Sequence, residues 1–158
     1  MANPLHARRL FVGLSRLMAP GIRHGVVRST RLGGRLCVLR TRGRRSGKLR
    51  EAALDYADAP DGGIWIAAGW GRATAWYLNL LSDPRVSVTC EGRTRAGHAT
   101  SITDPAERLR AIRAILVASG FVARLYAYDP RTASDSRLAA DFATTPIVHV
   151  AFDAVATA

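Results

Sequence analysis

Short segments with apolar residues at alternate positions run from Leu36 to the end of the chain, separated by turn signals. Period-two alternation predicts half-buried β-strands, and clusters rich in glycine and proline predict the turns between them. The predicted strands cover residues 36–39, 50–56, 64–68, 85–89, 94–102 and 146–152. Because only short helices interrupt these strands, the pattern predicts an α+β fold with an antiparallel barrel or sandwich, and argues against a βαβ sheet.

Two helices are expected between the strands. The first lies around residues 76–81, after a loop that contains Gly69 and Gly71. The second begins at residues 104–107, Asp-Pro-Ala-Glu, which form a capping box with proline at the first helical position. This helix stops before Gly120, and its predicted buried face consists of Leu109, Ile112 and Leu116.

The N-terminal residues predict a unit of their own. Residues 1–34 are expected to form a basic amphipathic helix and a linker, in front of a barrel domain over residues 35–158. The helix covers residues 5–18 and ends at Pro20, with its apolar face made by Leu10, Leu14, Leu17 and Met18. Two interpretations stay open for it: packing on the domain, or resting on an anionic membrane surface.

The chain shows no sign of crossing a membrane or of being secreted. No apolar run approaches the ~20 residues that a spanning helix needs. The one candidate signal segment, residues 10–18, is interrupted by Arg16 and lacks a small-residue cleavage site. We therefore expect a cytoplasmic protein, with peripheral contact at the inner face of the cell membrane as the further option.

The positive charge is concentrated at one end of the sequence. Residues 1–50 hold thirteen of the 23 basic residues and no acid, whereas the remaining residues carry ten basic and twelve acidic groups. A one-sided field of this kind weakens the fold by self-repulsion and indicates an anionic partner.

Residues 41–50, Thr-Arg-Gly-Arg-Arg-Ser-Gly-Lys-Leu-Arg, are the densest part of this charge. Gly43 and Gly47 allow a tight turn whose amide N–H groups can form a concave anion site. Guanidinium groups add bidentate donors for phosphate or carboxylate oxygens. A solvated hairpin tip and a grip on a nucleic-acid backbone are the alternatives. Because the aromatic residues are not interleaved with the basic ones, we expect no nucleic-acid partner.

Familiar catalytic and metal motifs are absent from the sequence. There is no GxSxG, HExxH or Walker loop, and the four histidines are scattered. His98 and His149 lie in strand patterns and are interpreted as structural. Cys37 and Cys90 lie within apolar alternations and are interpreted as small core residues of a reducing compartment, so no metal site is expected.

Four parts of the sequence together resemble the deazaflavin-dependent nitroreductase family. These are the Thr-x-Gly-Arg-Arg-Ser-Gly-x-x-Arg run, the strand 64–68 leading to Gly-Trp-Gly at 69–71, the Ala-Trp-Tyr-Leu-Asn-Leu run at 75–80, and Asp-Pro-Arg-Val at 83–86. The resemblance covers roughly residues 36–150. It implies a split β-barrel of the flavin-reductase and pyridoxamine-phosphate-oxidase type. It also implies coenzyme F-420, a deazaflavin with a phosphate and an oligoglutamate tail, with FMN as the alternative cofactor.

The resemblance assigns site residues position by position. The segment for the phosphate and tail corresponds to Arg44, Arg45, Ser46, Gly47, Lys48 and Arg50. The strand end beside the ring corresponds to Leu39, Arg40 and Thr41, and the strand and loop under the ring to Ala67, Ala68, Gly69 and Trp70. The helix that closes the site supplies Trp76 and Asn79, with a packing role as the alternative for Trp76. The substrate pocket corresponds to Phe121, Tyr126 and Tyr128, with core packing as the alternative and Tyr126 as candidate proton donor.

One departure from the family pattern affects the expected acceptor. Members that reduce nitroaromatics often carry Ser-Lys-Gly-Gly in the loop, whereas this chain has Gly-Trp-Gly-Arg at residues 69–72. The hydroxyl and the lysine are missing, and Arg72 is the candidate replacement for the lysine. This difference favours a divergent branch with another acceptor.

The resemblance therefore implies an F-420-dependent oxidoreductase that transfers a hydride between the deazaflavin and a small, apolar or quinone-like acceptor. The alternatives are a binding protein of the same fold for a flavin, haem or lipid, and a basic module for a membrane surface or nucleic acid. A homodimer is a further expectation, because split barrels commonly pair through their sheets.

Overall fold

The computed structural model describes residues 34–120 and 128–154, and the elements below are those of this part of the chain. They are β1 (Leu36–Arg42), β2 (Leu49–Asp58), β3 (Ile64–Ala67), α2 (Ala75–Ser82), β4 (Arg85–Cys90), β5 (Arg93–Ser101), α3 (Pro105–Ala118), α4 (Asp135–Asp141) and β6 (Ile147–Phe152). Every predicted strand is present, with ends shifted by a few residues. Both helices predicted between the strands are also present.

The six strands close into an antiparallel barrel in the order β1-β2-β3-β6-β5-β4, and β4 pairs back with β1. Tight turns connect the pairs β1–β2, β2–β3 and β4–β5. The pairs β3–β6, β5–β6 and β1–β4 join segments that are far apart in the sequence. The α+β barrel prediction is confirmed, and of the two layouts that the sequence left open the barrel is the one observed.

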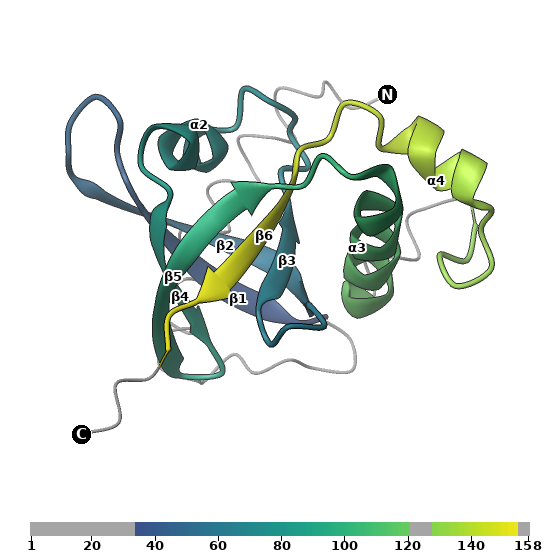
Figure 1. Ribbon diagram of the computed structural model, residues 1–158, viewed down its shortest axis with the longest axis horizontal. Helices are drawn as coiled ribbons and strands as arrows, with labels where there is room; N and C mark the ends of the chain where they lie inside the picture. Colours follow the sequence, from purple (N-terminus) through teal and green to yellow (C-terminus); the bar gives the residue numbers. More distant parts are fainter. Residues whose placement is uncertain (1–33, 121–127, 155–158) are drawn as a thin grey trace.

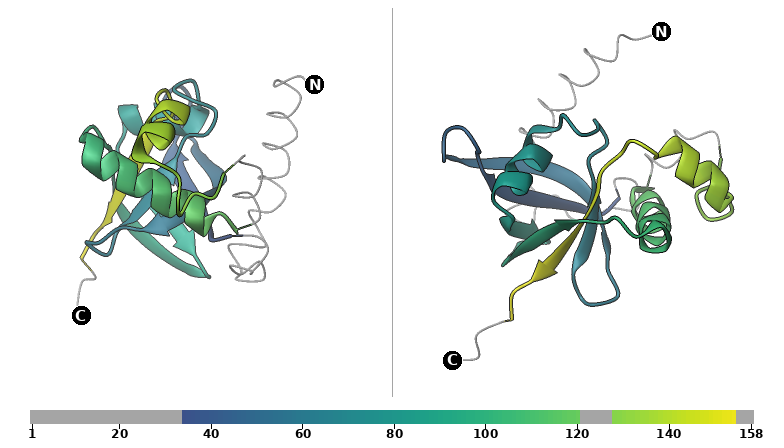
Figure 2. Two further views of the ribbon diagram at one scale, coloured as in Figure 1. Left: turned by 90° about the vertical axis from the view of Figure 1, so that its right-hand side faces the viewer. Right: turned by 45° about the horizontal axis from the view of Figure 1, so that its top comes forward.

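Alternation along the strands separates two apolar cores. Side chains of one face fill the barrel interior, including Leu39, Ile66 and Val88. Side chains of the other face, such as Trp65, pack with Ile112 of α3 in a second core outside the barrel. Figures 1 and 2 show α3 and α4 on one side of the barrel. Burial of each large aliphatic side chain contributes ~1.5–3 kcal/mol, so both layers stabilise the fold.

The N-terminal caps of α3 and α4 show why the first helix could be predicted from sequence and the second could not. The carboxylate of Asp104 accepts a hydrogen bond from the Glu107 amide at 2.7 Å, which is the predicted cap of α3. Helix α4 was not predicted. The hydroxyl of Ser134 caps it by accepting a hydrogen bond from the Arg137 amide at 3.2 Å, and Leu138 is its fully buried residue. A helix of seven residues with one buried side chain leaves no apolar periodicity to detect.

The predicted N-terminal helix over residues 5–18 lies outside the described residues, as does the linker as far as residue 33. The division into residues 1–34 and 35–158 therefore stays a prediction. Among the helices that the structure describes, none has the length and apolar character required to cross a bilayer.

Candidate functional site

The two ends of the barrel carry different loops. Because neighbouring strands are antiparallel, the end of β1, the start of β2, the end of β3 and the start of β4 all lie at one end. We call it the turn end, and it carries residues 43–50 (the basic turn), the loop 68–74 and α2. The opposite end carries the turns 59–63 and 91–92. Figure 1 shows α2 and the projecting β1–β2 hairpin on the side away from these two turns.

The basic turn is closed by its own backbone. The amide of Gly43 donates to the carbonyl of Lys48 at 2.8 Å, and the amide of Gly47 donates to the carbonyl of Gly43 at 2.7 Å. Gly47 has a φ of 66°, a conformation that favours glycine, as the sequence predicted. The amides of Arg45 and Ser46 donate no hydrogen bond to any described residue, so these two remain for an anion. The anion site at these amides stays a prediction.

Four cationic side chains of the basic turn point to solvent. Arg44, Arg45, Lys48 and Arg50 are all exposed. Among the described residues, none of the four forms a salt bridge. Four positive charges close together repel one another, and a bound anion would offset this repulsion.

A buried amide holds the basic turn against α2. The Asn79 Nδ2 donates to the Thr41 Oγ1 at 3.1 Å, and the Asn79 Oδ1 accepts from the Arg44 amide at 3.2 Å. Thr41 is 1% and Asn79 is 5% exposed, so water does not compete for these bonds. The orientation of the turn is thus fixed by a helix that comes much later in the chain.

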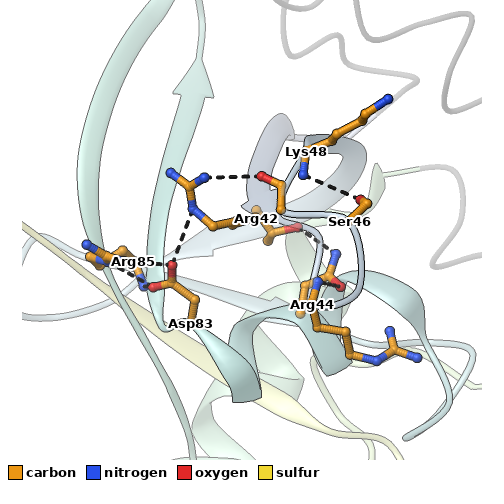
Figure 3. A network of polar contacts seen from close by, with 9 residues as sticks. Arg42, Arg44, Ser46, Lys48, Asp83 and Arg85 are labelled. Carbon is orange, nitrogen blue, oxygen red and sulfur yellow. Dashed lines mark hydrogen bonds and ion pairs between the residues drawn. The ribbon is translucent and has the colours of Figure 1, made fainter.

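Asp83, an acid close to the basic turn, is bonded to arginines that lie outside this turn. Asp83 accepts two hydrogen bonds from the Arg85 guanidinium, both at 2.9 Å, and lies 3.7 Å from the Arg42 Nε (Figure 3). The Arg85 guanidinium and amide lower the pKa of Asp83 to about 2. Arg42 also donates to the Gly47 carbonyl at 3.1 Å. The sequence analysis missed this arrangement, although an aspartate two residues before an arginine was its signal.

The loop after β3 presents a small exposed surface. Its first residue, Ala68, is fully buried, and its amide donates to the Pro146 carbonyl at 2.9 Å. The amide of Gly71 donates back to the Ala68 carbonyl at 2.7 Å, which closes a turn. Between them Gly69 has open space beside it, and Trp70 is 41% exposed. A flat apolar ligand can therefore approach the backbone at Gly69 next to an indole.

Other predicted ring residues form the framework beneath this surface. Leu39 lies in the barrel core, and Trp76 is 8% exposed with its ring edge-to-face to Tyr77 at 6.2 Å. Ala67 ends β3 and is half-buried. Arg40 faces outward and donates from its Nη2 to the Glu51 Oε1 at 2.7 Å. The packing alternative for Trp76 agrees with its burial.

The predicted substrate pocket is only partly covered by the structure. Phe121 and Tyr126 lie outside the described residues. Tyr128 packs against the outer core, with the Arg137 guanidinium 5.2 Å above its ring. Tyr128 therefore has a packing contact, and its predicted role toward substrate stays a prediction.

A second cationic region lies near the loop 68–74. The guanidinium of Arg108, on α3, donates to the carbonyls of Phe142 and Thr145, both at 2.6 Å. Its pKa is lowered by burial and by the nearby charge of Arg72. The sequence analysis named Arg72 but missed Arg108. Only the fold brings the two together.

The two histidines that the structure describes each lie beside an aspartate. His98 lies 3.2 Å from Asp153, and His149 lies 3.0 Å from Asp61. Within residues 34–120 and 128–154, no group of three or more histidine, cysteine, aspartate or glutamate side chains could hold a metal ion.

Comparison with known proteins finds a family model and solved structures that this chain resembles. Residues 18–131 match a family model described as F420H(2)-dependent quinone reductase. Comparison by sequence with curated proteins finds no match. A solved F420-H2 dependent reductase is 21% identical with a TM-score of 0.54, over 73% of this chain and 93% of that one.

Two further solved structures are similar in fold. One, described as a domain-swapped dimer, is 22% identical with a TM-score of 0.55, over 94% of this chain and 100% of that one. The other, a putative pyridoxamine 5'-phosphate oxidase from Listeria innocua, is 10% identical with a TM-score of 0.51, over 75% of this chain and 84% of that one. The second similarity agrees with the predicted type of barrel.

Proposed function

Because the chain belongs to the F420H(2)-dependent quinone reductase family, we propose that its acceptor is a small, apolar, quinone-like molecule. The protein is an oxidoreductase, and its cofactor is coenzyme F-420. The proposal concerns the acceptor, and the residues that bind the coenzyme at the turn end.

The site assignment rests on the difference between two parts of the turn end, the basic turn and the loop after β3. Cations without a carboxylate partner among the described residues lie on the basic turn, and an exposed glycine and indole lie on the loop after β3. Coenzyme F-420 has the same two parts, a polyanionic tail and a flat apolar ring. We infer that Arg44, Arg45, Lys48 and Arg50 bind the phosphate and tail, and that Gly69 and Trp70 contact the ring.

When bound, the reduced deazaflavin supplies the hydride from its ring carbon. The protein's part is to bind, to orient and to exclude water. The Asn79 side chain holds the basic turn by its bonds to Thr41 and Arg44, so the charges are positioned before the ligand arrives. The rigid turn from Ala68 to Gly71 supports the ring surface. A proton for the reduced acceptor comes from solvent or from Tyr126, which remains the candidate donor.

A steady-state assay tests the acceptor. Reduced F-420 is mixed with the protein and either a short-chain benzoquinone or a nitroaromatic compound, and the oxidised coenzyme is followed by its absorbance. We expect turnover with the quinone, and at least tenfold slower turnover with the nitroaromatic compound. Coenzyme binding without turnover of either acceptor would instead support the alternative of a binding protein.

The preferred cofactor can be tested by fluorescence titration. The cluster of four cations exceeds what the single phosphate of FMN requires, whereas it suits an oligoglutamate tail. F-420 should therefore bind more tightly than FMN. Equal or tighter binding of FMN would contradict the assignment of the basic turn to the tail.

Membrane contact and dimerisation remain part of the proposal. The sequence of residues 5–18 supports peripheral contact with anionic lipid at the inner face of the cell membrane, and the rest of the chain is expected in the cytoplasm. Sedimentation with anionic vesicles should decrease when residues 1–19 are deleted. A fold relative described as a domain-swapped dimer supports a homodimer, which light scattering would detect.

A further inference from the structure

The two cysteines of the chain face each other across the seam that closes the barrel. Cys37 of β1 is paired in register with Cys90 of β4. Both are free thiols. Both belong to the inner core, where Cys37 is buried and Cys90 packs against it from a partly exposed position. They lie toward the opposite end of the barrel, away from the basic turn.

The backbone hydrogen bonds show whether Cys37 and Cys90 form a hydrogen-bonded or a non-hydrogen-bonded pair of the antiparallel ladder. The Tyr56 amide donates to the Arg35 carbonyl at 3.0 Å, so Arg35 directs its backbone groups toward β2. Successive residues of a strand alternate sides, so Cys37, two residues later, also directs its backbone groups toward β2. Cys37 and Cys90 are therefore a non-hydrogen-bonded pair of the β1–β4 ladder.

Non-hydrogen-bonded pairs bring side chains closest together. Their Cα atoms are ~4.5 Å apart, within the ~4.4–6.8 Å that a disulfide spans. Because directly opposite residues point to the same face of the sheet, the two thiols are neighbours. A disulfide can therefore form here with little movement of the backbone.

The surroundings distinguish the two thiols. Cys90 is the more accessible one, and Tyr56, Arg35 and Arg95 lie close to it. Hydrogen bonds from Cys37 and Tyr56, together with the two guanidinium charges, lower the pKa of Cys90. The hydrogen bond to Cys90 and burial raise the pKa of Cys37. Cys90, the more accessible thiol, therefore forms a thiolate more readily, whereas Cys37 holds its proton more tightly.

We propose that Cys90 and Cys37 form a hydroperoxide-reactive dithiol that closes into a disulfide across the β1–β4 seam. The Cys90 thiolate attacks one oxygen of the hydroperoxide, the S–O bond forms, the O–O bond breaks, and the leaving oxygen takes a proton. The Cys37 thiol then attacks the Cys90 sulfur, the S–S bond forms and water leaves. The two thiols lose two electrons, which reduce the peroxide. This inference depends on the register of the seam and is independent of the proposed function.

Hydrogen peroxide added in stoichiometric amount to the reduced full-length chain tests the proposal. We expect the free thiol count to fall from two to zero, the mass to fall by two hydrogens, and dithiothreitol to reverse both. Digestion without reductant should give one cross-linked peptide pair containing residues 37 and 90. A thiol count that stays at two, or disulfides between chains in place of the internal one, would overturn the proposal.

Two variants separate the roles of the sulfurs. Cys37→Ala should retain a sulfenic acid at Cys90 that dimedone traps, because the resolving thiol is gone. Cys90→Ser should react at least tenfold more slowly, because its remaining thiol is buried. Equal rates for the two variants would overturn the assignment of Cys90 as the attacking thiol. Peptide mapping of the unsubstituted chain gives a decision even if a variant fails to fold.

Discussion

The cluster around Arg35 at the opposite end and the basic turn at the turn end differ in how their charges are paired. At the opposite end, the Arg35 guanidinium bonds to Asp58, and the His149 ring nitrogen lies 3.0 Å from the Asp61 carboxylate. At the turn end, the four exposed cations of the basic turn have no carboxylate partner among the described residues. An ion pair such as Arg35–Asp58 contributes to the fold, whereas like charges that lack a carboxylate repel one another. The four cations of the basic turn are therefore the ones that we propose to bind the coenzyme.

Hydrogen bonds between side chains differ between the two ends as well. Asn79 uses its whole amide to hold the basic turn through Thr41 and Arg44. At the opposite end, Tyr56 accepts a hydrogen bond from the Arg35 guanidinium at 3.1 Å, within a cluster that ends at Asp58. The bonds of Asn79 orient the basic turn, whose side chains stay exposed. The contacts of Arg35 join its guanidinium to the Tyr56 hydroxyl and the Asp58 carboxylate, which both accept from it. Substitutions at the two ends should therefore have different readouts.

The largest expected effect is on coenzyme affinity at the turn end. Arg45→Ala removes one charge-assisted contact and should weaken F-420 by about ten- to hundredfold, ~1.5–3 kcal/mol. A truncated deazaflavin without phosphate and glutamates should bind as before, and the loss should shrink in high salt. Arg93→Ala, an exposed arginine at the opposite end, is the matched control and should change neither affinity. Equal weakening of full and truncated ligands would remove the basic turn as the tail site.

The next effect combines stability with affinity. Asn79→Ala leaves the buried Thr41 hydroxyl and the Arg44 amide without their partner, and should lower the free energy of unfolding by about 1–3 kcal/mol. Because the basic turn is then no longer held, F-420 affinity should fall as well. Thr94→Ala breaks a 2.8 Å hydroxyl contact to Thr89 at the opposite end and should leave affinity intact. Denaturant titration and coenzyme titration of both variants measure the difference, and unchanged affinity in Asn79→Ala would contradict the role of α2.

A pH effect is expected outside the turn end. Burial beside the end of α3 raises the pKa of Asp55 from 3.8 to about 6. The folded state therefore binds this proton more tightly than the unfolded state, and the stability that it contributes is lost as pH rises from about 4 through 6. Asp55→Asn should remove that loss, so the variant should gain up to about 2 kcal/mol over the unsubstituted chain between pH 4 and pH 7. Denaturant titrations across this range test it, and parallel pH profiles would refute it.

The smallest effect is expected for a surface ion pair of the opposite end. Asp58→Asn weakens its pairing with Arg35, whose side chain is 37% exposed against 64% for Asp58. Exposed pairs contribute about 0–1 kcal/mol, so Tm should shift only slightly and F-420 affinity should not change. A change in affinity as large as that of Arg45→Ala would mean that the two ends are coupled.

Local features of the barrel could be predicted from sequence, whereas its closure could not. The turn at Gly43 and Gly47 and the capping box at Asp104 each depend on residues close in sequence, and both are observed. The pairing of β1 with β4 depends on strands separated by two others, and no periodicity specifies it. Cys37 and Cys90 could therefore be interpreted only as separate core residues.

The candidate site shows the same limit. Alternation and the resemblance selected Thr41, Arg44 and Asn79 as positions, but not the hydrogen bonds that join them. Arg108 was missed because its importance comes from its neighbour Arg72 and from two backbone carbonyls, all distant in sequence. Single positions were predictable where the residue type carries the chemistry. Contacts between distant segments required the structure.

The closed seam between β1 and β4 also has a consequence for the order of folding. The hairpins β1–β2 and β4–β5 join neighbouring segments, so they can form early at a small loss of chain entropy. The seam and the β3–β6 pair, in which Ile64 meets Val150, must wait for large loops to close. Until these pairs form, the separate groups of strands have open edges with unpaired backbone groups, and a second chain can occupy them. The rate of seam closure therefore sets how long the folding chain is exposed to misassembly, and at high concentration exchange of strands between chains competes with it.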